Sequence, residues 1–238
     1  MSVPVKVTVN SIRDIAPEKR FLIDELTIVG KFGLEQDLPI LKAMCNTIAD
    51  GRRTGGNLSV VDLSQSYIAL KFGYYVTNPY SWGSMEDCIS LKKISLPSQI
   101  LLSDYMGRFF SGCKSLESIK IVGNALPMCH EANGRGYDLD GVLYLEQKKR
   151  GKNTLLKYPA NKGTEYSIPN YITEIGDCAF EDSHLSRLTM PIVPPSCTEN
   201  AFKGVNLVAL TLVVPKGAHD SYWAHPVFGK FKIEEMDE

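Results

Sequence analysis

The chain has 238 residues, of which 44% are hydrophobic and 22% are charged, and its formal net charge is -1. This is ordinary globular composition, and so balanced a charge gives no reason to expect a nucleic-acid partner or a polybasic membrane-surface protein. No run approaches the roughly 18 apolar residues that a membrane span needs, so membrane insertion is not expected. No signal peptide is visible at the N-terminus, as would also be true if a leader had been removed.

Residues 1–57 are predicted to form an N-terminal cap that contains one amphipathic helix. Residues 3–9 alternate apolar and polar side chains and are expected to form a strand, and residues 21–29 are expected to form a second. The helix follows, with Asp37 as its N-cap and Gly51 after its last turn. An apolar stripe on this helix could cover the open end of a repeat array. The stripe consists of Leu38, Leu41, Met44, Cys45 and Ile48.

An internal repeat occupies most of residues 58–214. An apolar triplet spaced L-x-x-I-x-L recurs, and a Phe or Met anchor lies five or six residues before each well-formed copy. A strand that reads L-x-L places both apolar side chains on one face, and stacked copies extend a parallel sheet. Two looser copies begin at Leu26 and Leu58. The well-formed copies begin at Leu91, Leu116, Leu185 and Leu207, after the anchors Met85, Phe110, Phe180 and Phe202.

Two insertions, at residues 65–84 and 123–153, interrupt the repeat. The first is rich in aromatic side chains, although the whole chain is only 9% aromatic. Aromatic residues with polar tips suit protein and sugar recognition, because they bury a large area at low entropy cost. The same residues could instead pack on the edge of the array as part of a cap, so both interpretations stay open. The candidate ligand-binding residues are Tyr67, Tyr74, Tyr75, Tyr80 and Trp82.

The second insertion contains a basic run and a mixed run of possible metal ligands. The basic run, residues 148–152, is expected to form a hairpin tip, with a patch for an anionic ligand as the alternative. The mixed run Cys129-His130-Glu131 places three ligand types side by side. Because adjacent side chains rarely point at one metal ion, a solvated loop is expected there and no metal site is assigned.

Motifs for catalysis are missing from the sequence. There is no H-E-x-x-H, no G-x-S-x-G, no complete phosphate-binding loop and no C-x-x-C pair. Cys88 and Cys113 occupy equivalent repeat positions and are therefore expected to stack as small buried side chains. A disulfide stays open as the alternative if the chain is exported. No enzyme activity, catalytic residue or cofactor is expected.

Several segments share a pattern that goes beyond the apolar triplet. Residues 172–180 read I-x-x-I-G-x-x-A-F, residues 185–191 continue as L-x-x-L-x-M-P, and residues 110–116 read F-S-G-C-K-S-L. At these residues the chain resembles the BspA-like leucine-rich-repeat family of bacterial surface proteins. Residues 141–169 look like the hairpin-bearing repeat of that family, and the stretch from Leu212 to Trp223 looks like its terminal capping segment. The resemblance implies a right-handed curved solenoid, export, and roles in binding or adhesion.

The sequence thus predicts a single domain over residues 1–238, a β-rich α/β solenoid that is a right-handed leucine-rich-repeat array with parallel strands. A helical N-terminal cap (1–57) precedes the repeats (58–214), and a C-terminal capping segment (215–238) follows, with a short helix over 218–224 and a closing strand over 227–236. The expected function is that of a non-catalytic recognition module of an extracellular or cell-surface protein, with a protein or glycan ligand on a solenoid face. A structural spacer or self-association module is the alternative.

Overall fold

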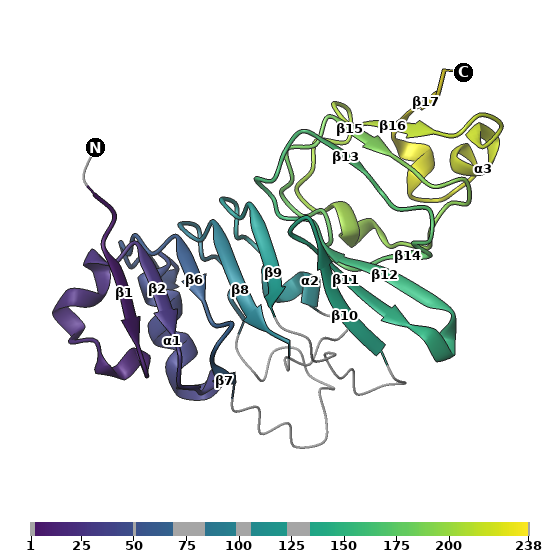
Figure 1. Cartoon of the computed structure of the whole chain (residues 1–238). Helices are drawn as coiled ribbons and strands as arrows, with labels where there is room; N and C mark the ends of the chain where they lie inside the picture. The colour runs from purple at the N-terminus through teal and green to yellow at the C-terminus, as the bar shows by residue number, and fades with distance from the viewer. Residues whose placement is uncertain (1–2, 50, 69–83, 99–105, 123–133, 238) are drawn as a thin grey trace.

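The computed structural model describes residues 3–49, 51–68, 84–98, 106–122 and 134–237. In this part of the chain the strands form a five-stranded sheet, two four-stranded sheets and two short ribbons. Figure 1 shows the five-stranded sheet in the N-terminal half, a four-stranded sheet at the C-terminal end and the other four-stranded sheet between them. Most strands pair in parallel and the helices are few and short, which fits a β-rich repeat fold.

The N-terminal block is built on five parallel strands that lie in chain order. Val61, Ile94 and Ile119 are register partners in three adjacent strands, and all three side chains are buried. They are the middle positions of three apolar triplets, so the predicted stacking of these copies is confirmed. The strands are β1 (Lys6–Val9), β2 (Glu25–Ile28), β6 (Val60–Asp62), β8 (Lys93–Pro97) and β9 (Ser118–Val122).

One helix, α1 (Leu34–Met44), packs into this block, and the bounds predicted for it are wrong at both ends. Gly33 is the N-cap, whereas Asp37 lies inside the helix, where its carboxylate accepts the Gly33 N–H at 2.7 Å. The helix ends at Met44 because Asn46 adopts a positive φ of 58°, and Ile48 therefore lies outside it. The rest of the predicted stripe is buried, namely Leu38, Leu41, Met44 and Cys45.

Short elements complete the N-terminal block. The strand predicted over residues 21–29 begins only at Glu25, because residues 17–22 form a 3-10 helix that opens on Pro17. Two ribbons lie beside the main sheet, one parallel (β3 with β7) and one antiparallel (β4 with β5). The bounds of these elements are η1 (Ile12–Asp14), η2 (Pro17–Leu22), β3 (Lys31–Phe32), β4 (Ile48–Ala49), β5 (Arg52–Arg53) and β7 (Tyr67–Ile68).

A hairpin sheet separates the two blocks of parallel strands. The basic run forms its tip as predicted, where η3 (Lys148–Arg150) ends on Gly151 with a φ of 59°. Neighbouring side chains of one strand enter different cores, because Leu143 packs into the N-terminal core and Tyr144 into the C-terminal core. This sheet is therefore a wall that both cores share. It consists of β10 (Gly134–Leu139), β11 (Val142–Gln147), β12 (Lys152–Lys157) and β14 (Glu174–Ile175).

The C-terminal block has four parallel strands, and here one predicted register is wrong. Leu188 pairs with Leu212, not with Leu210 as the triplet alignment predicts. The anchors Phe180 and Phe202 still stack, with ring centroids 5.2 Å apart. The segment between the anchor and the strand is therefore two residues longer in the last copy, from Phe202 to Leu212, than in the copy before it, from Phe180 to Leu188. The strands are β13 (Glu165–Ser167), β15 (Arg187–Thr189), β16 (Thr211–Val214) and β17 (Lys232–Glu235).

The predicted C-terminal helix is present as α3 (His219–Trp223). The closing strand is shorter than predicted, because η5 (Phe228–Lys230) occupies the first part of residues 227–236. Strand β17 pairs in parallel with β16, so it extends the sheet by one more strand. The remaining short helices are α2 (Met106–Phe109), between β8 and β9, and η4 (Glu199–Phe202), between β15 and β16.

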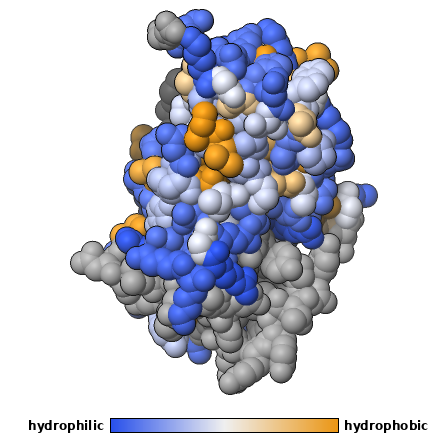
Figure 2. All heavy atoms as spheres, turned by 90° about the vertical axis from the view of Figure 1, so that its right-hand side faces the viewer, coloured by the Kyte–Doolittle hydropathy of each residue, from blue (hydrophilic) through white to orange (hydrophobic). Residues whose placement is uncertain are grey.

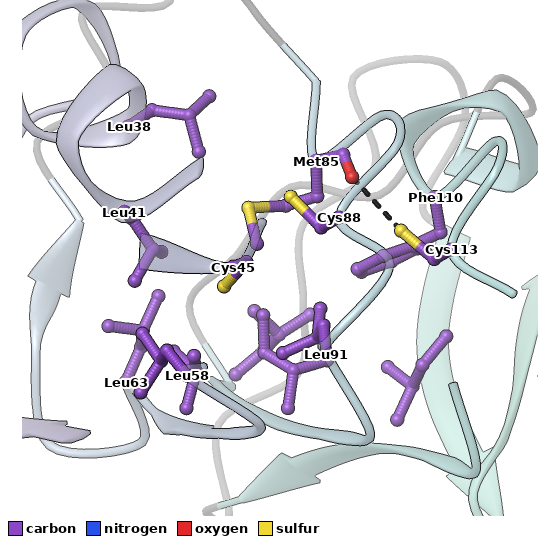
Figure 3. Packing of buried hydrophobic residues seen from close by; sticks show 14 of the residues in the cluster. Leu38, Leu41, Cys45, Leu58, Leu63, Met85, Cys88, Leu91, Phe110 and Cys113 are labelled. Carbon is purple, nitrogen blue, oxygen red and sulfur yellow. Dashed lines mark hydrogen bonds between the residues drawn. The ribbon is translucent and has the colours of Figure 1, made fainter. Parts of the chain in front are cut away.

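Successive coils approach each other closely at one corner of the repeat. Two residues after its anchor, each well-formed copy has a residue with positive φ, namely Asp87, Gly112, Asp182 and Gly204. A Cβ atom on Gly112 would lie 2.3 Å from Asp87 Oδ1, and one on Gly204 would lie 2.3 Å from Asp182 Oδ1. In both pairs, glycine in the second coil therefore provides the positive φ without a Cβ atom that would displace the aspartate side chain of the first coil. Figure 3 shows the core beside the first of these corners, with Met85, Phe110 and the repeat leucines in contact.

Candidate functional site

The aromatic insertion selected from the sequence lies almost entirely outside the described residues. Tyr67 is its one described member among the five candidates, in strand β7, where it pairs with Lys31 and is 67% exposed. The other four candidates, Tyr74, Tyr75, Tyr80 and Trp82, lie outside the described ranges, as does the run Cys129-His130-Glu131. Whether the aromatic insertion packs as a cap or binds a ligand therefore stays a prediction.

The structure brings together a second aromatic group that the sequence analysis missed. Five of the eleven tyrosines of the chain lie between residues 137 and 171, on the hairpin sheet, on strand β13 of the C-terminal block and in the loops beside them. The spacing between them is irregular, so only their density in the sequence could have indicated a cluster. The five are Tyr137, Tyr144, Tyr158, Tyr166 and Tyr171.

An open groove of about 370 Å³ lies on the hairpin sheet at the edge of this tyrosine cluster. Strand pairing explains its composition, because Arg135, Glu146 and Asn153 are register partners across β10, β11 and β12. Tyr137 lies two residues beyond Arg135 on the same face of β10. Tyr171 comes from the loop before β14. The groove lining, called the tyrosine groove below, is Arg135, Tyr137, Glu146, Asn153 and Tyr171.

The aromatic wall of the tyrosine groove, formed by Tyr137 and Tyr171, is supported by a buried ring and by hydrogen bonds. The Tyr137 ring stacks on the buried Tyr144 ring, with centroids 5.3 Å apart and an interplanar angle of 16°. The Tyr137 hydroxyl donates to the Tyr171 hydroxyl at 3.3 Å, and the hydroxyls of Tyr144 and Tyr166 are also hydrogen-bonded. Burial raises the pKa of Tyr137 and of Tyr144, and it raises that of Tyr166 to about 12 despite the hydrogen bond with Tyr144. These hydroxyls are therefore neutral hydrogen-bonding groups at physiological pH.

The polar side of the groove combines opposite charges with a fixed amide. Arg135 is exposed and Glu146 is half-buried, and across the described chain neither side chain has a hydrogen-bond or ion-pair partner. The Asn153 side-chain amide donates to the Tyr171 carbonyl at 3.1 Å, and its backbone N–H donates to Thr173 Oγ1 at 3.0 Å. The groove thus offers a guanidinium and a carboxylate to a ligand, beside an aromatic wall whose loop is fastened to β12.

A second polar cluster is buried at the junction of the two blocks and is closed to ligands. Glu181 accepts hydrogen bonds from Ser111 at 2.8 Å and from Lys203 at 2.8 Å, and Lys157 Nζ lies 3.9 Å from it. Burial lowers the pKa of Lys157, whose ammonium donates to the Cys178 carbonyl at 2.8 Å. Burial also acts to raise the pKa of Glu181, but the hydrogen bonds and the two lysine charges outweigh it, so this pKa is lowered. Loss of either partner would leave the other charge buried without its counter-charge, so Glu181 and Lys157 depend on each other.

The five described cysteines are free thiols, namely Cys45, Cys88, Cys113, Cys178 and Cys197. Three of them, Cys45, Cys88 and Cys113, lie in the core of the N-terminal block (Figure 3), where Cys113 Sγ donates to the Met85 carbonyl at 3.0 Å. The hydrogen bond with Cys113 lowers the pKa of Cys88, but the one with Cys45 and burial outweigh it and raise this pKa. Stacking of Cys88 and Cys113 as buried side chains is thus observed, and both behave as apolar core residues.

The face at the C-terminal end is largely hydrophilic, with a compact apolar patch near its centre and smaller apolar patches toward its edges (Figure 2). Such a face resembles an ordinary protein surface more than the broad apolar interface of an obligate dimer. Within the described ranges, no helix is long and apolar enough to cross a membrane, and no group of three or more His, Cys, Asp or Glu residues could hold a metal ion.

Comparison with known proteins agrees with the repeat. A family model described as the BspA type leucine rich repeat region matches six copies, at residues 77–130 and 158–218. No curated protein matches the chain.

Three bacterial structures are similar to the chain at low identity. The crystal structure of the pneumococcal vaccine antigen PcpA is 13% identical, with 80% of this chain and 39% of that chain covered and a TM-score of 0.34. A leucine-rich repeat protein from Eubacterium ventriosum is 16% identical, with 89% and 60% covered and a TM-score of 0.35. A leucine rich cell surface protein from Faecalibacterium prausnitzii is 14% identical, with 91% and 64% covered and a TM-score of 0.32. The chain therefore spans less than two thirds of each of these proteins.

Proposed function

We propose that the chain, in which six copies of the BspA type leucine rich repeat region are matched, is a non-catalytic recognition module that binds a protein or a glycan. In this proposal the module is part of an exported or cell-surface bacterial protein. Its parallel strands form a right-handed curved solenoid in a single domain, with α1 in the N-terminal cap and α3 in the C-terminal cap. The proposal includes no cofactor, no metal and no nucleic-acid partner. A fold does not fix a function, so it is the groove on the hairpin sheet that supports a binding role.

The tyrosine groove is the observation that carries the proposal. It combines aromatic area with guanidinium, carboxylate and hydroxyl groups, which is the combination that ligand sites use for affinity and orientation. Its wall is held in place by the Tyr137–Tyr144 stack and the Asn153–Tyr171 hydrogen bond, so little side-chain freedom is lost on binding.

The aromatic insertion at residues 65–84 is a second proposed site. Its candidates are Tyr67, Tyr74, Tyr75, Tyr80 and Trp82, and the high exposure of Tyr67 supports a role at the surface.

The proposed function is tested by incubating the purified chain with arrays of glycans and of host proteins. The same arrays are then probed with two variants, Tyr171→Ala in the groove and Tyr67→Ala in the insertion. Both side chains are exposed tyrosines, so each variant is the matched control of the other. Binding that is lost only in Tyr171→Ala assigns recognition to the groove, and binding lost only in Tyr67→Ala assigns it to the insertion. Silence on both arrays would contradict the proposal and favour the alternative of a structural spacer or self-association module.

A further inference from the structure

We infer that the tyrosine groove is a subsite for one neutral pyranose ring of a glycan. This inference rests on the proposed recognition function and deepens it, because it selects a ligand class and a place. Three features of the groove favour such a ligand, namely its aromatic wall, its charges and its size.

The aromatic wall suits the apolar face of a sugar ring. Tyr171 is 47% exposed at the rim, and Tyr137 is half-buried beside it. A pyranose presents its C–H bonds on one face and its hydroxyls around the edge, so it can stack on a tyrosine and still form hydrogen bonds outward. The linked hydroxyls of Tyr137 and Tyr171 add a hydrogen-bond donor and an acceptor at the same rim.

The charges of the groove favour a neutral ligand over an anionic one. Arg135 and Glu146 are register partners on adjacent strands, so the groove carries one positive and one negative group. A sialic acid or uronic acid would find a carboxylate beside the guanidinium, and this repulsion would offset the attraction. A neutral sugar can use both groups, since hydroxyls donate to Glu146 and accept from Arg135.

The size and openness of the groove fit a single ring within a longer chain. A volume of about 370 Å³ lies at the small end of the range of about 300–1,000 Å³ for ligand pockets. The groove is open to solvent, so neighbouring sugars of a longer chain can extend from it. Weak binding per ring is therefore expected, with affinity gained by repetition of the contact along a polysaccharide or across several copies of the protein.

The inference is tested by saturation-transfer difference NMR on the full chain. The neutral probes are the methyl glycosides of α-mannose, β-galactose and β-N-acetylglucosamine, and N-acetylneuraminic acid is the anionic comparison. At least one neutral glycoside is expected to receive saturation on its ring C–H protons. Tyr171→Ala should weaken its binding about tenfold, and Glu146→Gln should weaken it about fivefold. Tyr67→Ala, which removes an exposed tyrosine outside the groove, should leave binding unchanged.

Three results would overturn the inference. Saturation of N-acetylneuraminic acid alone would show an anion site, and saturation that is undiminished in Tyr171→Ala would place the sugar elsewhere. No saturation of any probe would also overturn it. Failure of the proposed function is recognised separately by the protein array. A protein ligand that is captured by the wild type and lost in Tyr171→Ala, with all sugars silent, would contradict the sugar subsite and leave the recognition module supported.

Discussion

At the scale of single residues, backbone conformation decides which positions of the repeat can vary. The corner two residues after each anchor needs a positive φ, and glycine, asparagine and aspartate tolerate that conformation better than other residues. The sequence follows this rule, with Asn46 after α1, Asp87 and Gly112 in the N-terminal block and Asp182 and Gly204 in the C-terminal block. Where two coils stack, the aspartate of one coil fills the space above the glycine of the next.

Replacement of Gly112 by alanine should therefore lower the free energy of unfolding by more than the strain of a positive φ alone would. Gly112 has a φ of 70°, and a Cβ atom there would lie 2.3 Å from Asp87 Oδ1. We expect Gly112→Ala to lower the free energy of unfolding by about 3 kcal/mol, from left-handed strain and overpacking together. Gly151→Ala is the control, since Gly151 has a φ of 59° and no atom within 4 Å, and should cost about 1 kcal/mol. Equal losses in urea denaturation would contradict the close approach of the coils.

At the scale of elements, the hairpin sheet connects the two blocks through its side chains and through a buried charge cluster. Strand β11 sends Leu143 to one core and Tyr144 to the other. Glu181 joins three parts of the chain, because it is bonded to Ser111 after α2, to Lys203 after η4 and, across 3.9 Å, to Lys157 on β12. Helix α2 lies against the same junction, where a Cβ atom on Gly107 would meet the Asp177 carbonyl oxygen at 2.1 Å.

The Glu181 cluster predicts a pH-dependent loss of stability. The folded pKa of Glu181 is lowered, so its contribution is present above the ordinary glutamate pKa of about 4.3 and is lost as the pH falls through the folded pKa. Glu181→Gln should lower the free energy of unfolding by about 3 kcal/mol at pH 7, because it leaves Lys157 buried without its counter-charge. The difference from the wild type should shrink below about pH 4.

The control for this prediction is Glu199→Gln, which removes an exposed carboxylate that pairs with Lys230. An exposed pair contributes little, so this variant should follow the wild type at every pH. Urea denaturation at pH 7, 5 and 3.5 checks both variants. A Glu181→Gln variant as stable as the wild type at pH 7 would show that the buried cluster contributes nothing to stability.

The sequence predicted the elements whose pattern is local and missed those that depend on distant pairing. The triplets at Leu58, Leu91 and Leu116 predicted the correct register. In each of these three copies the strand lies at the same position relative to the triplet. The copy at Leu207 failed because two residues were added between its anchor and its strand. The tyrosine groove could not be predicted, since it forms only when β10, β11, β12 and the loop at Tyr171 come together. The burial of both faces of β11 could not be predicted either, because its residues form an apolar run without alternation, and such a run does not show which core each side chain enters.

At the scale of the whole molecule, the parallel repeats are interrupted by a sheet that carries the proposed binding site. The parallel strands form two separate sheets, and the hairpin sheet lies between them (Figure 1). One face of the hairpin sheet completes the N-terminal core, and the other face contributes to the C-terminal core and ends in the tyrosine groove. The repeats thus act as the scaffold that holds this sheet.

A shared wall predicts that both blocks unfold together. Scanning calorimetry at pH 7 should show one endothermic transition, because loss of the hairpin sheet exposes apolar side chains of both cores. Leu143→Ala should lower the transition temperature without splitting it, although its side chain lies only in the N-terminal core. Two separated transitions would mean that the blocks are independent domains and would contradict the proposed single domain over residues 1–238.

The central claim, that recognition occurs at the tyrosine groove, is tested most directly by hydrogen-exchange mass spectrometry of the intact chain with and without a ligand selected on the arrays. The account predicts protection of the backbone amides of β10, β11 and β12 and of the loop at Tyr171, with no change in β16 and β17 at the C-terminal end. Protection confined to the parallel strands of either block or to the aromatic insertion, with exchange in the hairpin sheet unchanged, would contradict it.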